Sequence, residues 1–291
     1  MGVGNAQTPA PTAGAASPIQ HLVVIFQENI SFDHYFGTYP FAANPEGEPA
    51  FFAYPNTPSV NGLGPAFLNN NATLFNSANG TGAAAPFRLD RSQAATADQD
   101  HDYTAEQIAY HSGIVDLFPM GTGTAGPPPS GSPVTATTGL VMGYYDGNTV
   151  TAYWNYAQHY AMSDNSYGTN FGPSTDGALN VISGQLNGAI NNTNGTGSLI
   201  EDGSGGMTVI SDADPAGDVC STTTGETFSM SGKNIGDLLN AAGVSWGWFE
   251  GGFDLTATNP NGTTGCARST TSLITKSKKA DYIPHHEPFQ Y

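Results

Sequence analysis

Two neighbouring side chains near the start of the chain could hold a metal ion. Glu28 and Asn29 follow residues 22–26, a short apolar run rich in β-branched side chains. A carboxylate beside an amide offers the hard oxygen ligands that divalent cations prefer. A plainer interpretation is that these residues cap the next turn or helix. The spacing leaves both interpretations open.

Two adjacent hydroxyls in the middle of the chain form a second candidate site. Ser174 and Thr175 follow Pro173 and precede the helical run 178–182, and a proline suits the entry to a helix. Free N–H groups and the positive dipole end at a helix start stabilise an anion such as phosphate. The alternative is that one of the two hydroxyls is an ordinary N-cap.

The element that must present Glu28 is the run 22–26. It is too short for a helix and has no polar alternation, which predicts a parallel strand buried on both faces. Open α/β sheets carry their ligand groups at the carboxyl ends of such strands. Glu28 and Asn29 lie at that end.

Apolar periodicity predicts three more helices. The first lies within 102–118 and is capped by Asp102 or Thr104, the second covers 149–162, and the third covers 234–242. A stop at Gly243 and a strand follow the third helix. We interpret the aromatic residues of the second helix as core packing and the histidine of the first as structural; they are Tyr153, Trp154, Tyr160 and His111.

The charge balance excludes one class of partner. The 291 residues carry 24 Asp and Glu against 7 Lys and Arg, a formal net charge of −17. Such a chain is not expected to bind nucleic acid, and it is repelled by anionic membranes. The lysines at 276, 278 and 279 are read as a solvated loop. The hydrophobic content of 38% is enough for a sizeable core.

The remaining composition is typical of a secreted or periplasmic protein. Only 11% of residues are charged, and Cys220 and Cys266 would close a stabilising loop if they are paired. No stretch approaches the roughly 20 apolar residues of a transmembrane helix. We expect a flexible leader over 1–18, a folded region over 19–291, and within that region a loop-rich insertion at about 41–96.

Five segments in register carry a family resemblance: QENISFDHYFG, DQDHDYTAEQIAYHSGIVDLF, FGPSTDGALNVISGQ, WGWFEGGF and DYIPHHEPFQY. Together they resemble the bacterial phosphoesterase family of phospholipases C and acid phosphatases, within the alkaline phosphatase-like superfamily. The resemblance covers 19–291, so the folded region is expected to be a phosphoesterase domain. It implies an α/β fold, a three-layer α/β/α sandwich.

The resemblance also implies roles for individual residues. The family's metal-binding pair falls on Glu28 and Asn29, with Asn29 also near the substrate. Its nucleophile, which also contacts the metal, falls on Ser174, with Thr175 as the adjacent substrate-binding alternative. The family's histidines, which contact phosphate or transfer protons, match His101 and His286, with His285 alongside.

The chain departs from the family pattern in two ways. Asp176, Gly177 and Ala178 stand where many members have Pro, Asn and Arg, and Glu287 replaces a common Asn. The family's remaining metal ligands come from a second half that would follow Tyr291. We therefore expect a portion of the domain that is incomplete at the C-terminus and weakly active or inactive.

The implied activity is metal-assisted hydrolysis of a phosphate ester or phospholipid through a phosphoserine, with a divalent cofactor of unknown identity. These residues do not distinguish phospholipase C activity from acid phosphatase activity, and the sequence does not indicate the oligomeric state. A second hypothesis is a non-catalytic secreted binding or surface module that keeps the fold. A carboxylic esterase is disfavoured because no G-x-S-x-G elbow surrounds Ser174.

Overall fold

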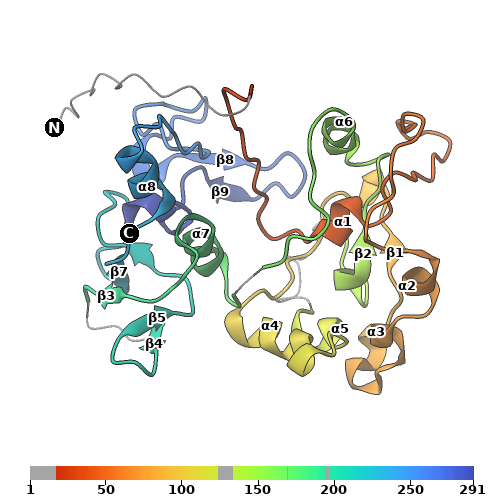
Figure 1. Ribbon diagram of the computed structural model, residues 1–291, viewed down its shortest axis with the longest axis horizontal. Coiled ribbons are helices and arrows are strands. Elements are labelled where there is room, and N and C mark those ends of the chain that lie inside the picture. Colours follow the sequence, from red (N-terminus) through yellow and green to blue (C-terminus); the bar gives the residue numbers. More distant parts are fainter. Residues whose placement is uncertain (1–17, 124–133, 169, 194–196) are drawn as a thin grey trace. The chain divides into compact units, whose positions relative to one another are not determined.

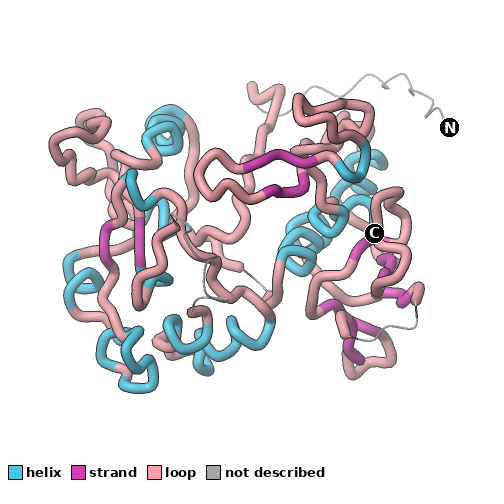
Figure 2. The backbone as a smooth tube through the Cα atoms, turned by 180° about the vertical axis from the view of Figure 1, so that it is seen from behind, coloured by secondary structure: helices cyan, strands magenta, loops and turns pink. Residues whose placement is uncertain are grey.

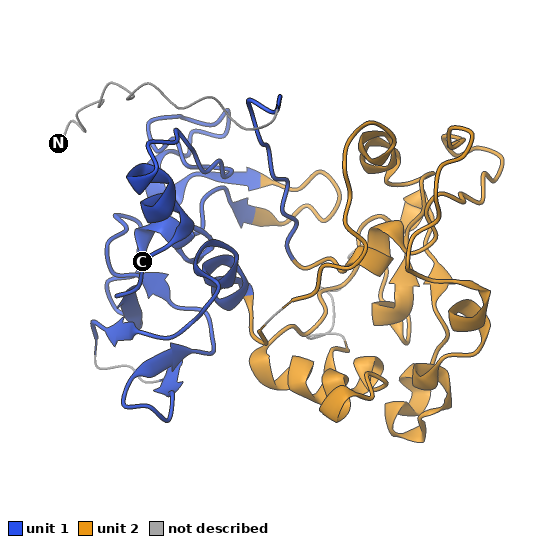
Figure 3. Cartoon of the chain, in the orientation of Figure 1, with its two compact units in different colours: residues 1–28, 174–270, 279–291 blue, residues 29–173, 271–278 orange. Residues whose placement is uncertain are grey.

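The computed structural model describes residues 18–123, 134–168, 170–193 and 197–291. Most of the leader expected over 1–18 therefore lies outside the described residues. The chain forms two compact units (Figure 3). Unit 1 comprises Met1–Glu28, Ser174–Thr270 and Lys279–Tyr291, and unit 2 comprises Asn29–Pro173 and Thr271–Lys278. Helices and small sheets occur together, so the fold is mixed α/β (Figures 1 and 2).

Unit 1 holds most of the strands. A three-stranded sheet has the order β3-β7-β6, in which β3 is antiparallel and β6 parallel to β7. Two-stranded sheets pair β4 with β5 and β8 with β9. The strands are β3 (Ala189–Asn191), β4 (Leu199–Glu201), β5 (Met207–Val209), β6 (Asp214–Pro215), β7 (Thr227–Met230), β8 (Ser269–Thr271) and β9 (Lys278–Ala280).

The core of unit 1 joins these strands to a helix. Leu199 of β4 lies opposite Val209 of β5, and both are buried. Leu179 brings the apolar face of α7 (Ser174–Ser183) onto the same cluster, where Phe228 of β7 is fully buried. Burying these side chains is the main favourable contribution to the folding of unit 1.

The second helix of unit 1, α8 (Ile235–Ala241), is fixed at both ends. Asn234 caps it by accepting the N–H of Asp237 at 3.2 Å, and Asp237 in turn accepts the N–H of Asn234. After the helix, Gly243 has a φ of 68°, which glycine adopts without strain. The predicted helix over 234–242 and its stop are confirmed.

The two cysteines are paired. Cys220 and Cys266 form a disulfide with an S–S distance of 2.02 Å, between positions 46 residues apart. Both belong to unit 1. The bond links the segment before β7 to a short 3-10 helix before β8.

The regular secondary structure of unit 2 is mainly helical. Its one sheet in the described residues pairs β1 (Phe87–Arg88) in parallel with β2 (Gly143–Tyr144). Its helices are α1 (Phe32–Phe36), α2 (Pro65–Asn69), α3 (Ala72–Phe75), α4 (Tyr103–Tyr110), α5 (Phe118–Gly121) and α6 (Thr151–His159). The predicted helices within 102–118 and 149–162 correspond to α4 and α6 and are confirmed, with shorter bounds.

Two of the aromatic residues predicted to pack in the core, Trp154 in α6 and Tyr160 just after it, differ in burial. Trp154 is fully buried and packs edge-on against Phe51 and Tyr39, with ring centroids 5.0 and 5.2 Å away. The prediction that Tyr160 packs in the core is wrong, because its side chain is 74% exposed. The helix ends at His159, and the extended backbone at Tyr160 turns its ring away from the buried face.

The histidine of the first predicted helix is structural, as expected. His111 terminates α4 with a left-handed φ of 45°. Its Nδ1 lies 2.6 Å from Oδ1 of Asp116, and hydrogen bonding to His111 lowers the pKa of that carboxyl. The pair closes the turn that follows the helix.

The prediction of a buried strand over 22–26 is wrong. These residues form no strand, and their apolar side chains are 64–83% exposed. A buried parallel strand needs hydrogen-bonded neighbours and cover on both faces, and no sheet of the described residues includes this segment. The strand predicted after Gly243 is also absent: residues 244–250 belong to no strand and no sheet of the described residues.

Among the described residues, no helix has the length and apolar character needed to cross a bilayer.

Candidate functional site

The amino terminus of α7 presents two hydroxyls in different environments. Ser174 is the first residue of the helix and is partly buried, and its hydroxyl makes no hydrogen bond to any residue that the structure describes. Thr175 is completely buried. Pro173 directly precedes Ser174 and fixes the backbone at the helix entry. The predicted helix start is therefore confirmed, and Ser174 is the hydroxyl left available.

Thr175 is held by a carboxylate from another part of unit 1. Its N–H and its Oγ1 both donate to Oδ1 of Asp212, each at 2.9 Å. Asp212 thus supplies the cap that a residue before the helix usually supplies. The Thr175 hydroxyl therefore already has a carboxylate acceptor, whereas the Ser174 hydroxyl has no partner among the described residues.

Asp212 also faces a predicted histidine. Its Oδ2 lies 3.8 Å from Nε2 of His285, and Oδ1 of Asp214 lies 3.4 Å from Nδ1 of the same ring. The backbone carbonyl of His285 lies 3.5 Å from Oγ1 of Thr175. The short 3-10 helix Pro284–His286 therefore packs against the start of α7, and its first histidine lies between two carboxylates.

The neighbouring histidine contacts the predicted metal ligand. Nε2 of His286 lies 3.5 Å from Oε1 of Glu28. Burial lowers the pKa of His286, and the Glu28 carboxylate partly offsets that effect. A lowered pKa favours the neutral imidazole at neutral pH, which can accept a proton.

Further carboxyl groups surround Glu28. Glu287 is buried and hydrogen-bonds to Glu250. Burial, together with the charges of Glu287 and Glu28, raises the pKa of Glu250 to about 7. Burial raises the pKa of Glu287 as well. The region around Glu28 is thus rich in carboxyl groups that resist ionisation.

These groups only partly satisfy the requirements of a metal site. Within the described residues, no group of three or more His, Cys, Asp and Glu side chains is arranged to hold a metal ion. The predicted ligands Glu28 and Asn29 offer a carboxylate and an amide, which suit a hard divalent cation but are few. Neither residue caps α1, since Ser31 does so by accepting the N–H of His34 at 3.3 Å.

His101 and Asn29 belong to unit 2. Nδ1 of His101 hydrogen-bonds to the carbonyl of Gln99 at 2.8 Å, just before α4. Burial raises the pKa of Glu106 on α4, and the hydrogen bond from Gly172 and the electrostatic attraction of His101 partly offset that rise. Glu106 in turn accepts the N–H of Gly172 at 2.8 Å. This contact fixes the backbone two residues before Ser174.

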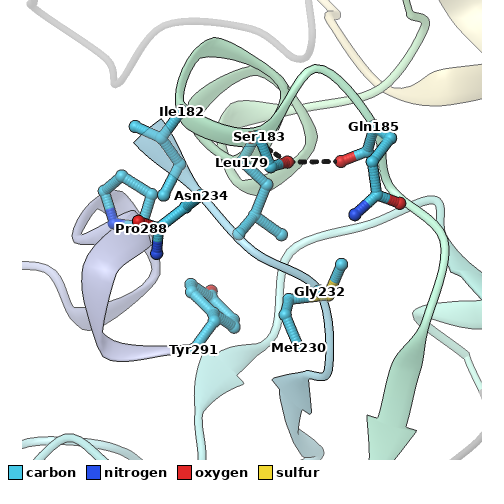
Figure 4. Close-up of a pocket in the computed structure, with 9 residues that line it drawn as sticks. All are labelled: Leu179, Ile182, Ser183, Gln185, Met230, Gly232, Asn234, Pro288 and Tyr291. Atoms are coloured by element: carbon cyan, nitrogen blue, oxygen red, sulfur yellow. Dashed lines mark hydrogen bonds between the residues drawn. The ribbon is translucent and has the colours of Figure 1, made fainter. Parts of the chain in front are cut away.

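A cavity beside α7 is too small for a substrate. Figure 4 shows it beside the carboxyl-terminal half of the helix, lined by Leu179, Ile182 and Ser183 with residues such as Tyr291. Its volume of about 30 Å³ has room for about one water molecule. The Oγ of Ser183 bonds the carbonyl of Gln185 at 2.7 Å across it. We interpret this cavity as a small gap in the packing around α7 and not as a binding site.

Several carboxylates were missed in the sequence: Asp212, Asp214 and Glu250 in unit 1, and Glu106 in unit 2. A signal for the first two was present, because Asp-Ala-Asp in extended backbone points both carboxylates to one side. Nothing in the sequence paired them with His285. The contact of Glu106 with Gly172 joins positions 66 residues apart, which no local pattern predicts.

Comparison with known proteins adds an independent observation. A model of the "Phosphoesterase family" matches residues 19–289. "Phospholipase C A" from two strains of Mycobacterium tuberculosis, CDC 1551 / Oshkosh and H37Rv, is 28% identical over 166 residues. The match covers 53% of this chain and 27% of each relative, so the chain matches about a quarter of the relatives' length.

Proposed function

Because the chain belongs to the phosphoesterase family, we propose that it hydrolyses phosphate esters with Ser174 as the nucleophile. The observation that carries the proposal is that the two hydroxyls at the start of α7 have different partners. Asp212 binds Thr175, whereas the Ser174 hydroxyl has no hydrogen-bond partner among the described residues. A hydroxyl with no hydrogen-bond partner among the described residues, at the positive end of a helix dipole, suits attack on an anionic phosphoryl group.

The proposed first step transfers the phosphoryl group to the protein. Oγ of Ser174 attacks phosphorus in line, the P–O bond to the leaving alcohol breaks, and the serine proton passes to a neutral histidine, which we assign to His286. His285, when protonated between Asp212 and Asp214, would donate a proton to the leaving alkoxide. The product is a phosphoserine, which water then hydrolyses.

The other predicted residues are assigned supporting roles. His101 would contact the phosphoryl oxygens, as the family resemblance implies. Glu28 and Asn29 would hold a divalent cation of unknown identity, and that ion would supply Lewis acidity toward the phosphoryl oxygens. We propose for the whole domain the family's three-layer α/β/α sandwich, which the mixed α/β content of both units supports.

Substrate class and location are also proposals. The similarity to proteins called phospholipase C supports a phospholipid or a related phosphodiester over a simple phosphomonoester. The Cys220–Cys266 disulfide supports secretion to an oxidising compartment. Turnover by the 291-residue chain alone should be weak, because its described residues include no metal-holding cluster.

The test is phosphoenzyme trapping, which needs only one turnover. The chain is mixed with p-nitrophenyl phosphate and a divalent cation, quenched in acid, and analysed by intact mass and peptide mapping. We expect a phosphoryl adduct on Ser174 that is lost in Ser174→Ala and retained in Thr175→Val. An adduct that persists in Ser174→Ala and maps to Thr175 would move the nucleophile by one residue.

The alternative is a non-catalytic binding module. The partial ligand set around Glu28 favours it. If no adduct forms with any of several divalent cations or with a phosphodiester substrate, while the chain remains folded, the module is the correct interpretation.

A further inference from the structure

One long segment of unit 2 combines exposed aromatic rings with almost no charge. Residues 35–87 contain two charged side chains, Glu46 and Glu48, in a protein of net charge −17. Glu48 is paired with Arg88. The exposed rings of this segment, which we call the aromatic set, are those of Phe41, Phe52, Tyr54, Phe67 and Phe75, with side chains 56–79% exposed.

The aromatic set projects from a fixed frame. Phe51 is buried against Trp154, and its N–H and C=O bond the Asn44 side chain at 2.9 and 3.0 Å. The adjacent ring of Phe52 is 79% exposed. The N–H of Tyr54 donates to Gln158 of α6 at 2.7 Å. The exposed rings of Phe52 and Tyr54 are therefore carried by backbone that these contacts hold.

A cavity lies between the first rings of the aromatic set. It has a volume of about 350 Å³, and its walls include Phe41, Phe52, Tyr54 and Asn56. No charged side chain lines it. From this loop beside α6, the segment continues along one edge of unit 2 to α2 and α3, which carry Phe67 and Phe75 (Figures 1 and 2). Such walls suit an uncharged or zwitterionic ligand with apolar parts.

We propose that the aromatic set docks unit 2 on a zwitterionic phospholipid surface, with the rings at the boundary between headgroups and acyl chains and the cavity receiving part of one lipid. Aromatic side chains favour this boundary, and an uncharged segment enters it without stripping water from ions. The net charge of −17 repels anionic lipid. The biological role of this docking rests on the proposed function, because docking would bring a phospholipid substrate to the enzyme.

The exposed segment 22–26 is a poorer lipid contact despite its apolar side chains. Its backbone N–H and C=O groups make no hydrogen bond within the described residues. Moving them into lipid would remove their water partners without replacement, which is costly. In the aromatic set, by contrast, the backbone next to the rings is partly satisfied by Asn44 and Gln158.

The experiment measures binding of the full chain to vesicles of phosphatidylcholine by flotation, with no turnover required. In the variant Phe41→Asn/Phe52→Asn we expect the partition coefficient to fall about tenfold or more. The matched control Tyr160→Asn/Tyr167→Asn removes two rings that are 74% and 76% exposed in the same unit and should change it less than about twofold. Both variants keep the net charge.

A second control addresses the other apolar surface. Val24→Asn/Phe26→Asn should bind vesicles as the parent does, and binding should persist from about 0.1 to about 1 M salt, because it is not ionic. Parent binding should also be weaker on vesicles containing phosphatidylserine.

Four results would overturn the proposal: no binding to phosphatidylcholine, equal losses of binding in the two paired variants, loss of binding in Val24→Asn/Phe26→Asn, or preference for anionic vesicles.

The alternative ligand is a carbohydrate. If the parent binds a neutral oligosaccharide but not vesicles, and Phe41→Asn/Phe52→Asn loses that binding, the aromatic set is a carbohydrate site instead. Phosphoenzyme formation on soluble substrate should be equal in parent and Phe41→Asn/Phe52→Asn, so failure of docking is separable from failure of the proposed function.

Discussion

The start of α7 and the segment 22–26 were predicted to present the two halves of one site, Ser174 and Glu28, and they differ in how far the described chain supports them. At α7, Asp212 binds both Thr175 donors, and Leu179 anchors the helix in the core. The segment 22–26 has exposed side chains and no backbone partner among the described residues. A helix closes its own hydrogen bonds, whereas a strand depends on neighbours.

The largest expected effect on stability comes from removing the Cys220–Cys266 disulfide, which cross-links two segments of unit 1. In Cys220→Ala/Cys266→Ala, the unfolded chain regains the freedom of a 46-residue loop, which should lower the free energy of unfolding by about 4 kcal/mol. Hydrogen exchange should show α7 losing protection, while the amides of 22–26 exchange quickly before and after. Strong protection of 22–26 in the parent would break the comparison.

Asp212→Ala should have the next largest effect. It leaves the buried N–H of Thr175 without its acceptor and the hydroxyl with only longer contacts of 3.5 Å, which should cost about 3 kcal/mol in urea unfolding. Asp212→Asn keeps an acceptor oxygen and should recover part of the loss. Asp202→Ala is a suitable control, because Asp202 bonds only its own loop at Ser204 and Gly206. A neutral Asp212→Ala would mean that α7 is not held by this contact.

A smaller effect should follow pH near Glu250. Its pKa rises from 4.5 unfolded to about 7 folded, so the folded state binds the extra proton between these values. Stability should therefore be fully present below about pH 4.5 and fall as pH rises toward 7, by about 1 kcal/mol after allowance for solvent screening. Glu250→Gln should flatten this dependence in urea titrations. A parent whose stability rises over the same window, with Glu250→Gln unchanged, would contradict the assignment.

The smallest effect is expected in the exposed segment. Val24→Asn should change the free energy of unfolding by less than about 0.5 kcal/mol, because the side chain is 72% exposed. Leu179→Ala, on the buried face of α7, is the contrasting variant and should cost about 3 kcal/mol. A large loss in Val24→Asn would show that this segment is packed in solution.

The sequence predicted those elements whose causes are local. The proline before Ser174, the Asn234 cap with Gly243, and the apolar periodicity of α4 and α6 are each contained within a few residues, and the structure follows them. The interpretation of 22–26 failed because strand formation depends on partners distant in the chain. Asp212 was missed for the same reason, since its acceptor role depends on Thr175, 37 residues away.

The exposed segment 22–26 also bears on how the protein behaves at high concentration. Its five consecutive apolar residues have no backbone hydrogen-bond partner among the described residues, and such a segment can pair with the same segment of another molecule. Such runs nucleate cross-β aggregates. The net charge of −17 opposes this association through mutual repulsion. Added salt screens that repulsion, so self-association of the chain at high protein concentration should increase with ionic strength.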